Sequence, residues 1–99
     1  MKNQSIVFCG LSKNNKNTLV QNVEFINEFQ ELFSKEDIHL LVIDTDSNDG
    51  SKEYIKKMCN SKIHMLNMDN IDKKYKSRVQ RIQVCRNKGL DFIDENFNN

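Results

Sequence analysis

The segment Ile38 to Ile43 constrains the fold most, because it is an apolar run of strand length that stops abruptly at the acidic, turn-rich stretch Asp44 to Ser51. A run that is apolar on both faces is typical of a strand covered on both sides in a parallel sheet. Parallel neighbours require long crossover connections, usually helices. The run therefore predicts an α/β protein in which helices separate the strands.

The rest of the chain supplies the expected alternation of strands and helices. A strand over 5–11 precedes a polar stretch at 12–17, and an amphipathic helix over 18–34 begins with Asn17 or Thr18 as its cap. A short helix at 51–59, a weaker strand at 63–66 and a long helix within 71–97 follow. The order β-α-β-α-β-α predicts a three-layer, Rossmann-like parallel sheet, with residues 1–99 as a single domain.

Charge and cysteine content exclude several classes of protein. The 99 residues carry 15 Lys plus Arg and 14 Asp plus Glu, and a net charge of +1 gives no footprint for nucleic acid. The apolar runs are too short to span a membrane. Three separated cysteines without a CxxC pair favour a reducing compartment, so we expect a cytoplasmic protein with Cys9 and Cys85 as buried small hydrophobes.

The loops after the first two strands are the predicted ligand site, since open parallel sheets bind ligands beyond the carboxyl ends of their strands. The acidic loop Asp44 to Ser51 lacks the Gly and Glu positions of an EF-hand, and it has no glycine-rich phosphate motif. Its carboxylates suit donors instead: ribose hydroxyls, a base N–H, or a metal that bridges to phosphate. Asp44 and Asp46 are the candidates, whereas Asp49 and Ser51 could simply cap the next helix.

The last helix combines an apolar arc with a charge. On a helical wheel, Arg86 lies near the centre of an arc formed by Tyr75, Val79, Ile82, Leu90, Ile93 and Phe97. An arginine in such an arc needs a carboxylate, carbonyl oxygens or a ligand phosphate, unless it extends to solvent or the helix breaks nearby. Arg78 and Arg81 belong to another arc, which is either a solvated face or a contact for a diphosphate.

Two segments carry a resemblance to a known family. The run Val42 to Ser51 resembles the "V-x-D-x-x-S-x-D-G-T" segment of family 2 glycosyltransferases with the GT-A fold, and Cys85 to Leu90 resembles their "A-R-N-x-G" segment. The two segments occur in the family's order, and the resemblance as a whole covers most of the chain, about residues 5 to 97. The resemblance implies the N-terminal, nucleotide-binding half of a GT-A fold.

The resemblance also implies a ligand and a set of contacts. A UDP-sugar would be the donor from which complete relatives transfer a sugar to an acceptor, and Asp44 would bind the uracil. The implied nucleotide-binding residues are Ser12, Asn14, Asp44, Asp46 and Arg86, with Arg78 and Arg81 as candidates for diphosphate contacts. Complete relatives are expected to use Mg²⁺ or Mn²⁺ at a DxD motif. Asp44-Thr45-Asp46 spells DxD but matches the earlier base-binding segment, so we assign it no metal.

The departures from the family pattern limit what we expect of this chain. Leu11 to Asn14 stands where the family often has Pro and a Tyr-Asn pair, and the sequence ends where the DxD strand should begin. We therefore expect no catalytic residue or cofactor here, no transfer by these 99 residues alone, and a C-terminal half or partner chain elsewhere. Two alternatives stay open: a non-catalytic α/β binding module or remnant whose third strand pairs with another chain, and a receiver-like phosphoacceptor domain.

Overall fold

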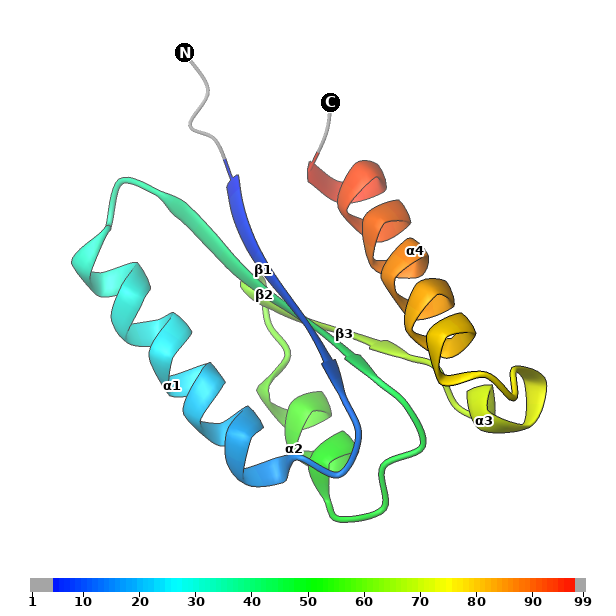
Figure 1. Ribbon diagram of the computed structural model, residues 1–99. Helices are drawn as coiled ribbons and strands as arrows, with labels where there is room; N and C mark the ends of the chain where they lie inside the picture. Colours follow the sequence, from blue (N-terminus) through cyan, green and yellow to red (C-terminus); the bar gives the residue numbers. More distant parts are fainter. Residues whose placement is uncertain (1–4, 98–99) are drawn as a thin grey trace.

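A parallel sheet of three strands lies between two layers of helices (Figure 1). The computed structural model describes residues 5–97. Its elements are β1 (Ser5–Ser12), α1 (Lys16–Leu32), β2 (Asp37–Asp44), α2 (Ser51–Met58), β3 (Ile63–Asn67), α3 (Ile71–Lys74) and α4 (Arg78–Phe97). The strand order is β1-β2-β3, and both neighbouring pairs are parallel. The predicted three-layer α/β fold is therefore confirmed.

The central strand β2 holds the core together because its two faces serve two separate clusters. Ile38, Leu40 and Val42 pack toward α1 and α2, while Leu41 and Ile43 pack toward α3 and α4. All five are almost completely buried. Burial of each such side chain contributes about 1.5 to 3 kcal/mol, so this strand is the main apolar contribution to stability. The apolar run predicted both the position of β2 and its burial on both faces.

Helix α1 begins earlier than its sequence pattern predicts. It starts at Lys16 with Asn15 as the N-cap residue, so the expected cap at Asn17 or Thr18 is wrong. The free backbone N–H of Lys16 donates to Asp49 Oδ2 over 3.2 Å. Because this acceptor comes from a loop 33 residues away, no local capping pattern could predict it.

The predicted long helix within residues 71–97 is interrupted. The short α3 ends at Lys74, the next residue, Tyr75, has an extended backbone, and α4 starts at Arg78. The guanidinium of Arg81 donates to the carbonyl oxygens of Tyr75 and Lys76, at 3.1 and 2.8 Å. These bonds satisfy carbonyl groups that a continuous helix would have paired internally, and so they stabilise the break.

Helix α4 faces the sheet with only part of the predicted side: Ile93 packs on the core and Phe97 contacts the His39 ring, but the face is rotated toward Cys85 and Gly89. Its buried residues are Cys85 and Gly89, whereas Val79, Ile82 and Leu90 are exposed. Arg86 is exposed too, so the prediction that it is buried in an apolar stripe is wrong. The helical wheel ranks residues by hydrophobicity and therefore overlooks glycine, but only a small residue allows the helix backbone to approach the sheet closely.

Two further expectations concern single residues and the membrane. Cys85 is buried as predicted, but Cys9 is exposed, because β1 lies at the edge of the sheet and not inside it. Within residues 5–97, none of the helices combines the length and apolar character that crossing a bilayer requires.

Candidate functional site

The carboxyl ends of the three strands meet at one edge of the sheet, where the candidate site lies. Ser12, Asp44 and Asn67 are neighbours across the sheet. Backbone hydrogen bonds continue just past the strand ends. Thr45 N, after β2, donates to the carbonyl of Ser12 at 2.9 Å, and Met68 N, after β3, donates to the carbonyl of Asp44 at 2.8 Å. The predicted meeting of the first two loops at this edge is confirmed.

Asp44 is fully buried and only half of its carboxylate is engaged. Its Oδ1 accepts a hydrogen bond from the hydroxyl of Ser47 at 2.6 Å. Its Oδ2 has no hydrogen-bond partner within residues 5–97, and neither has the buried Oγ of Ser12 on the adjacent strand. A buried acceptor without a donor costs about 1 to 3 kcal/mol. Two such atoms at adjacent strand ends are a reason to look for a ligand donor there.

Two loops close over this pair of strand ends. The backbone N–H of Asn14 donates to Ser47 Oγ at 2.9 Å, and that of Asn48 donates to Asn14 Oδ1 at 2.7 Å. Asn14 has a left-handed backbone with φ 54°, a conformation that asparagine adopts more readily than most residues. These bonds are at the surface, so a ligand could exchange them for its own without disturbing the core.

Asp46 and Asp49 hold the loops in place. Asp46, whose φ is 50°, accepts a hydrogen bond from Asn70 N at 2.6 Å and so joins the β2 loop to α3. Asp49 accepts hydrogen bonds from the backbone and hydroxyl of Ser51 at the start of α2. The Ser51 hydroxyl is the main reason that the pKa of Asp49 is lowered. The N-cap residue of α2 is Gly50, so Asp49 binds the start of the helix from the position before the cap.

The structure does not build a metal site from these acids. Asp44 binds Ser47 and Asp46 binds Asn70, so the two carboxylates of the DxD-like triplet serve different partners. Across residues 5–97, no group of three or more His, Cys, Asp or Glu side chains is placed to hold a metal ion.

A cleft of about 260 Å³ opens beside Ser12, between the ends of β1 and β2 and the start of α4. It is lined by Leu11, Ser12, Lys13, Thr45, Ile71, Asp72, Arg78, Arg81, Ile82 and Cys85. Three of these side chains are cationic and one is anionic. The walls of the cleft therefore attract an anion.

The charged groups of the cleft differ in how firmly they are held. Asp72 contacts Lys13 at 2.6 Å and the Nε of Arg81 at 3.3 Å, and the hydrogen bond from Lys13 is the main reason that its pKa is lowered. Arg81 is fixed further by its two bonds to carbonyl oxygens at the break before α4. Arg78 is exposed and forms no ion pair or hydrogen bond with other residues of 5–97, so it can turn toward a ligand.

The seven predicted site residues do not share one surface. Ser12, Arg78 and Arg81 line the cleft, and Asp44 lies behind Ser12 without reaching the cleft wall. The remaining three are Asn14 and Asp46, which belong to the loops, and Arg86. Arg86 lines a neighbouring cleft of about 290 Å³ between β1 and α4, together with Cys9, Leu11, Ile82, Leu90 and Ile93.

Sequence reasoning missed two charged residues of the cleft. Lys13 directly follows β1, so the rule that selects strand ends could have found it. Asp72 reaches the cleft only because α3 packs against the sheet edge through the buried Ile71, and no local pattern signals that. The pair Lys52 and Asp69, which joins α2 to the segment after β3, was missed for the same reason.

The chain is an α/β domain whose edge at the carboxyl ends of the strands is polar and carries a cation-lined cleft. Comparisons with family models, with curated proteins and with solved structures find no match for this chain.

Proposed function

We propose that this chain is a nucleotide-binding α/β domain of the glycosyltransferase type, which binds the nucleoside diphosphate part of a UDP-sugar. The motif resemblance and the strand-end geometry both support this proposal. The observation that carries it is the position of two unpartnered buried oxygens, the carboxylate Oδ2 of Asp44 and the hydroxyl Oγ of Ser12, beside a cleft with an excess of positive charge. A nucleoside diphosphate combines donor groups on its base and ribose with an anionic tail, and so it matches both features.

Each end of the ligand has its own contacts in this proposal. Arg78 and Arg81 bind the diphosphate, with Lys13 completing the cationic wall. The hydrogen bond between Asn14 and Ser47 first breaks and the two loops open. Asp44 then accepts a hydrogen bond from the base or ribose. Opening replaces surface hydrogen bonds with bonds to the ligand, so the exchange costs little free energy.

The proposal includes the cellular location and the donor. All three cysteines are free, as expected of a protein in the reducing cytoplasm. The proposed sugar donor is a nucleotide-sugar. In a transfer reaction, binding of the diphosphate orients the sugar toward an acceptor hydroxyl.

NMR titration with three ligands tests the proposal: UDP, uridine and pyrophosphate. We expect UDP to shift amide signals of residues 12–17, 44–51 and 78–81. Asp44→Asn should weaken UDP and uridine binding about 5- to 30-fold, because a charge-assisted hydrogen bond is worth about 1 to 2 kcal/mol more than a neutral one. It should leave pyrophosphate binding unchanged.

Arg78→Ala is the complementary variant, with Lys88→Ala as its control. Both remove an exposed cation from α4, but Lys88 does not line the cleft. We expect Arg78→Ala to weaken UDP and pyrophosphate and to spare uridine, and Lys88→Ala to change none of the three. Absence of shifts at saturating UDP, or shifts centred elsewhere, would overturn the proposal in favour of a non-catalytic module.

A further inference from the structure

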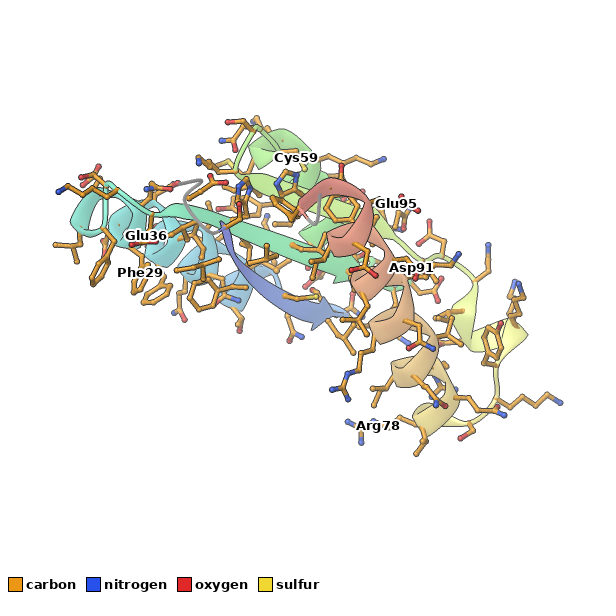
Figure 2. All side chains as sticks on the ribbon, turned by 90° about the horizontal axis from the view of Figure 1, so that it is seen from above. Phe29, Glu36, Cys59, Arg78, Asp91 and Glu95 are labelled. Carbon is orange, nitrogen blue, oxygen red and sulfur yellow. The ribbon has the colours of Figure 1, made fainter. Side chains whose placement is uncertain are left out.

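The exposed hydrophobic side chains of this protein gather around one edge of the sheet. Within residues 5–97, every large hydrophobic side chain that is exposed belongs to β1, to α1 and the residue after it, or to α4. They are Ile6, Phe8, Leu11, Phe25, Leu32, Phe33, Val79, Ile82 and Leu90. Figure 2 shows β1 at the open border of the sheet, with Phe29 of α1 and Arg78 of α4 toward the same side. A surface of this kind marks an interaction site.

The strand at this border has none of the usual protection against pairing. β1 is an edge strand of eight residues, SIVFCGLS, without a charge or a proline. It pairs with β2 in unbroken register, so no bulge turns it away. Edge strands of stable monomers normally carry such devices, because the free N–H and C=O groups would otherwise template another strand. The opposite edge, β3, has only five residues.

Two apolar strips flank the open strand, one on each face of the sheet. The aromatic strip consists of Phe8, Phe25, Phe29 and Phe33, with Phe8 centred 6.2 Å from Phe25 and 5.8 Å from Phe29. The aliphatic strip consists of Leu11, Val79, Ile82 and Leu90, of which Leu11, Ile82 and Leu90 line the cleft between β1 and α4. Val79 continues the same face of α4, one turn before Ile82.

We propose that β1 pairs antiparallel with β1 of a second copy of this chain, which joins the two sheets into one of six strands. A twofold axis perpendicular to the sheet relates such neighbours. This axis brings the aromatic strip against its own copy on one face and the aliphatic strip against its own copy on the other. The surface is therefore self-complementary, as a twofold interface must be.

The exposed area is sufficient for such a dimer. The nine side chains expose 38% to 78% of their surface. Together they present on the order of 700 Å² per chain, close to the roughly 800 Å² that each partner buries in a stable interface of standard size. Arg86 is the charged residue of the cleft between β1 and α4, and its long side chain can extend into solvent when two copies meet.

The space around Gly10 selects the register. A side chain at Gly10 would have no heavy atom of this chain within 4 Å, so the position leaves a gap on the face that carries Phe8. Pairing centred on Cys9 sets the Phe8 ring of each chain opposite Gly10 of the other and fills this gap. The same register places the two Cys9 residues opposite each other, with Cβ atoms about 4.5 to 5.5 Å apart.

Molar mass in solution and thiol cross-linking test the dimer. We expect light scattering after size exclusion to give twice the mass of the chain, and a short bismaleimide to link two chains through Cys9. Cys9→Ser should abolish the link and Cys59→Ser should not, although both thiols are exposed. A monomer at the concentrations used for NMR, or a link that depends on Cys59, would overturn the proposal.

Charge substitutions separate loss of the dimer from loss of the fold. Phe25→Lys and Leu11→Lys place a cation in each strip, and Asn27→Lys adds the same charge to α1 on another face of the helix. Circular dichroism confirms that each variant is folded. We expect at least a tenfold weaker dimer for the first two and no change for Asn27→Lys. A dimer that both strip variants leave intact would contradict pairing through β1.

Discussion

Gly89 of α4 lies so close to Ile43 of β2 that a Cβ atom at position 89 would be 2.8 Å from Ile43 Cδ1. The same Cβ would be 3.3 Å from Cys9 Sγ, so it would also crowd β1. The glycine of the Cys85 to Leu90 segment therefore sets the distance between helix and sheet.

We expect Gly89→Ala to lower the free energy of unfolding by about 1 kcal/mol. Overpacking costs about 1 to 3 kcal/mol, and the better helix propensity of alanine returns roughly 1 kcal/mol. Adding Ile43→Val removes the crowded Cδ1, so the double variant should lose less than the sum of the single changes in urea unfolding. Strictly additive losses would show that the two residues do not compete for space.

Arg86→Ala should change the free energy of unfolding by less than about 0.5 kcal/mol, as is usual for surface positions. The apolar arc alone predicts a loss of about 1 to 4 kcal/mol, which applies to a buried charge. Arg81→Ala is the control on the same helix, because it removes two hydrogen bonds to carbonyl oxygens. We expect it to cost about 1 to 2 kcal/mol. Equal losses for both variants would place Arg86 in the core.

Most of the fold could be predicted because strands and helices follow from local periodicity. The run at Ile38 to Ile43 identified the central strand, and the polar loops gave the direction of the ligand edge. The orientation of α4 could not be predicted, since it depends on the contact between Gly89 and Ile43, 46 positions apart. The exposed position of β1 at the edge of the sheet could not be predicted either, because the strand order depends on how the whole sheet assembles.

The candidate site was predictable in part for the same reason. Asp44 and Ser12 end strands, so their place at the edge follows from the strand pattern. Asp72 enters the cleft through the packing of α3, and the separation of Arg86 from the cleft follows from the rotation of α4. Both are outcomes of tertiary packing, which a wheel or a motif does not contain.

Stability should fall in mild acid because of His64. The Nε2 atom of His64 lies 2.9 Å from Nδ1 of His39, and its ring packs against Phe97. Burial is the main cause that lowers the pKa of His64; the charge of His39 lowers it further, and Asp37 acts in the opposite direction. A lowered folded-state pKa means that the unfolded chain binds the proton more readily. The stabilisation is therefore complete above about pH 6.5, the unfolded value, and decreases as the pH falls through the folded value.

Thermal unfolding between pH 7.5 and 5.5 measures this dependence, and His64→Gln is the comparison. Glutamine keeps a polar side chain beside His39 but does not titrate. We expect the melting temperature of the wild type to drop more steeply than that of the variant. Parallel curves would assign the acid sensitivity to other groups.

Asp44→Asn should stabilise the fold by about 1 kcal/mol. The amide keeps an acceptor for the Ser47 hydroxyl, and it replaces the unpartnered, buried Oδ2 with a neutral donor group. This group lies at the end of β2, next to the end of β1 where Ser12 Oγ is also unpartnered. Functional sites often contain residues that favour ligand binding at the expense of folding stability, and Asp44 would be such a residue. Urea unfolding measures the change.

Asp49→Asn is the matched control, because it makes the same chemical change in the same loop with the opposite expected sign. The Asp49 carboxylate uses both oxygens, accepting from Lys16 at the start of α1 and from Ser51 at the start of α2. An amide can keep only one of these acceptors, so we expect a loss of about 1 kcal/mol, as for removal of a helix cap. If Asp44→Asn destabilises the protein as much as Asp49→Asn does, Asp44 is a structural acceptor. The unpartnered Oδ2 of Asp44 then does not indicate a ligand site.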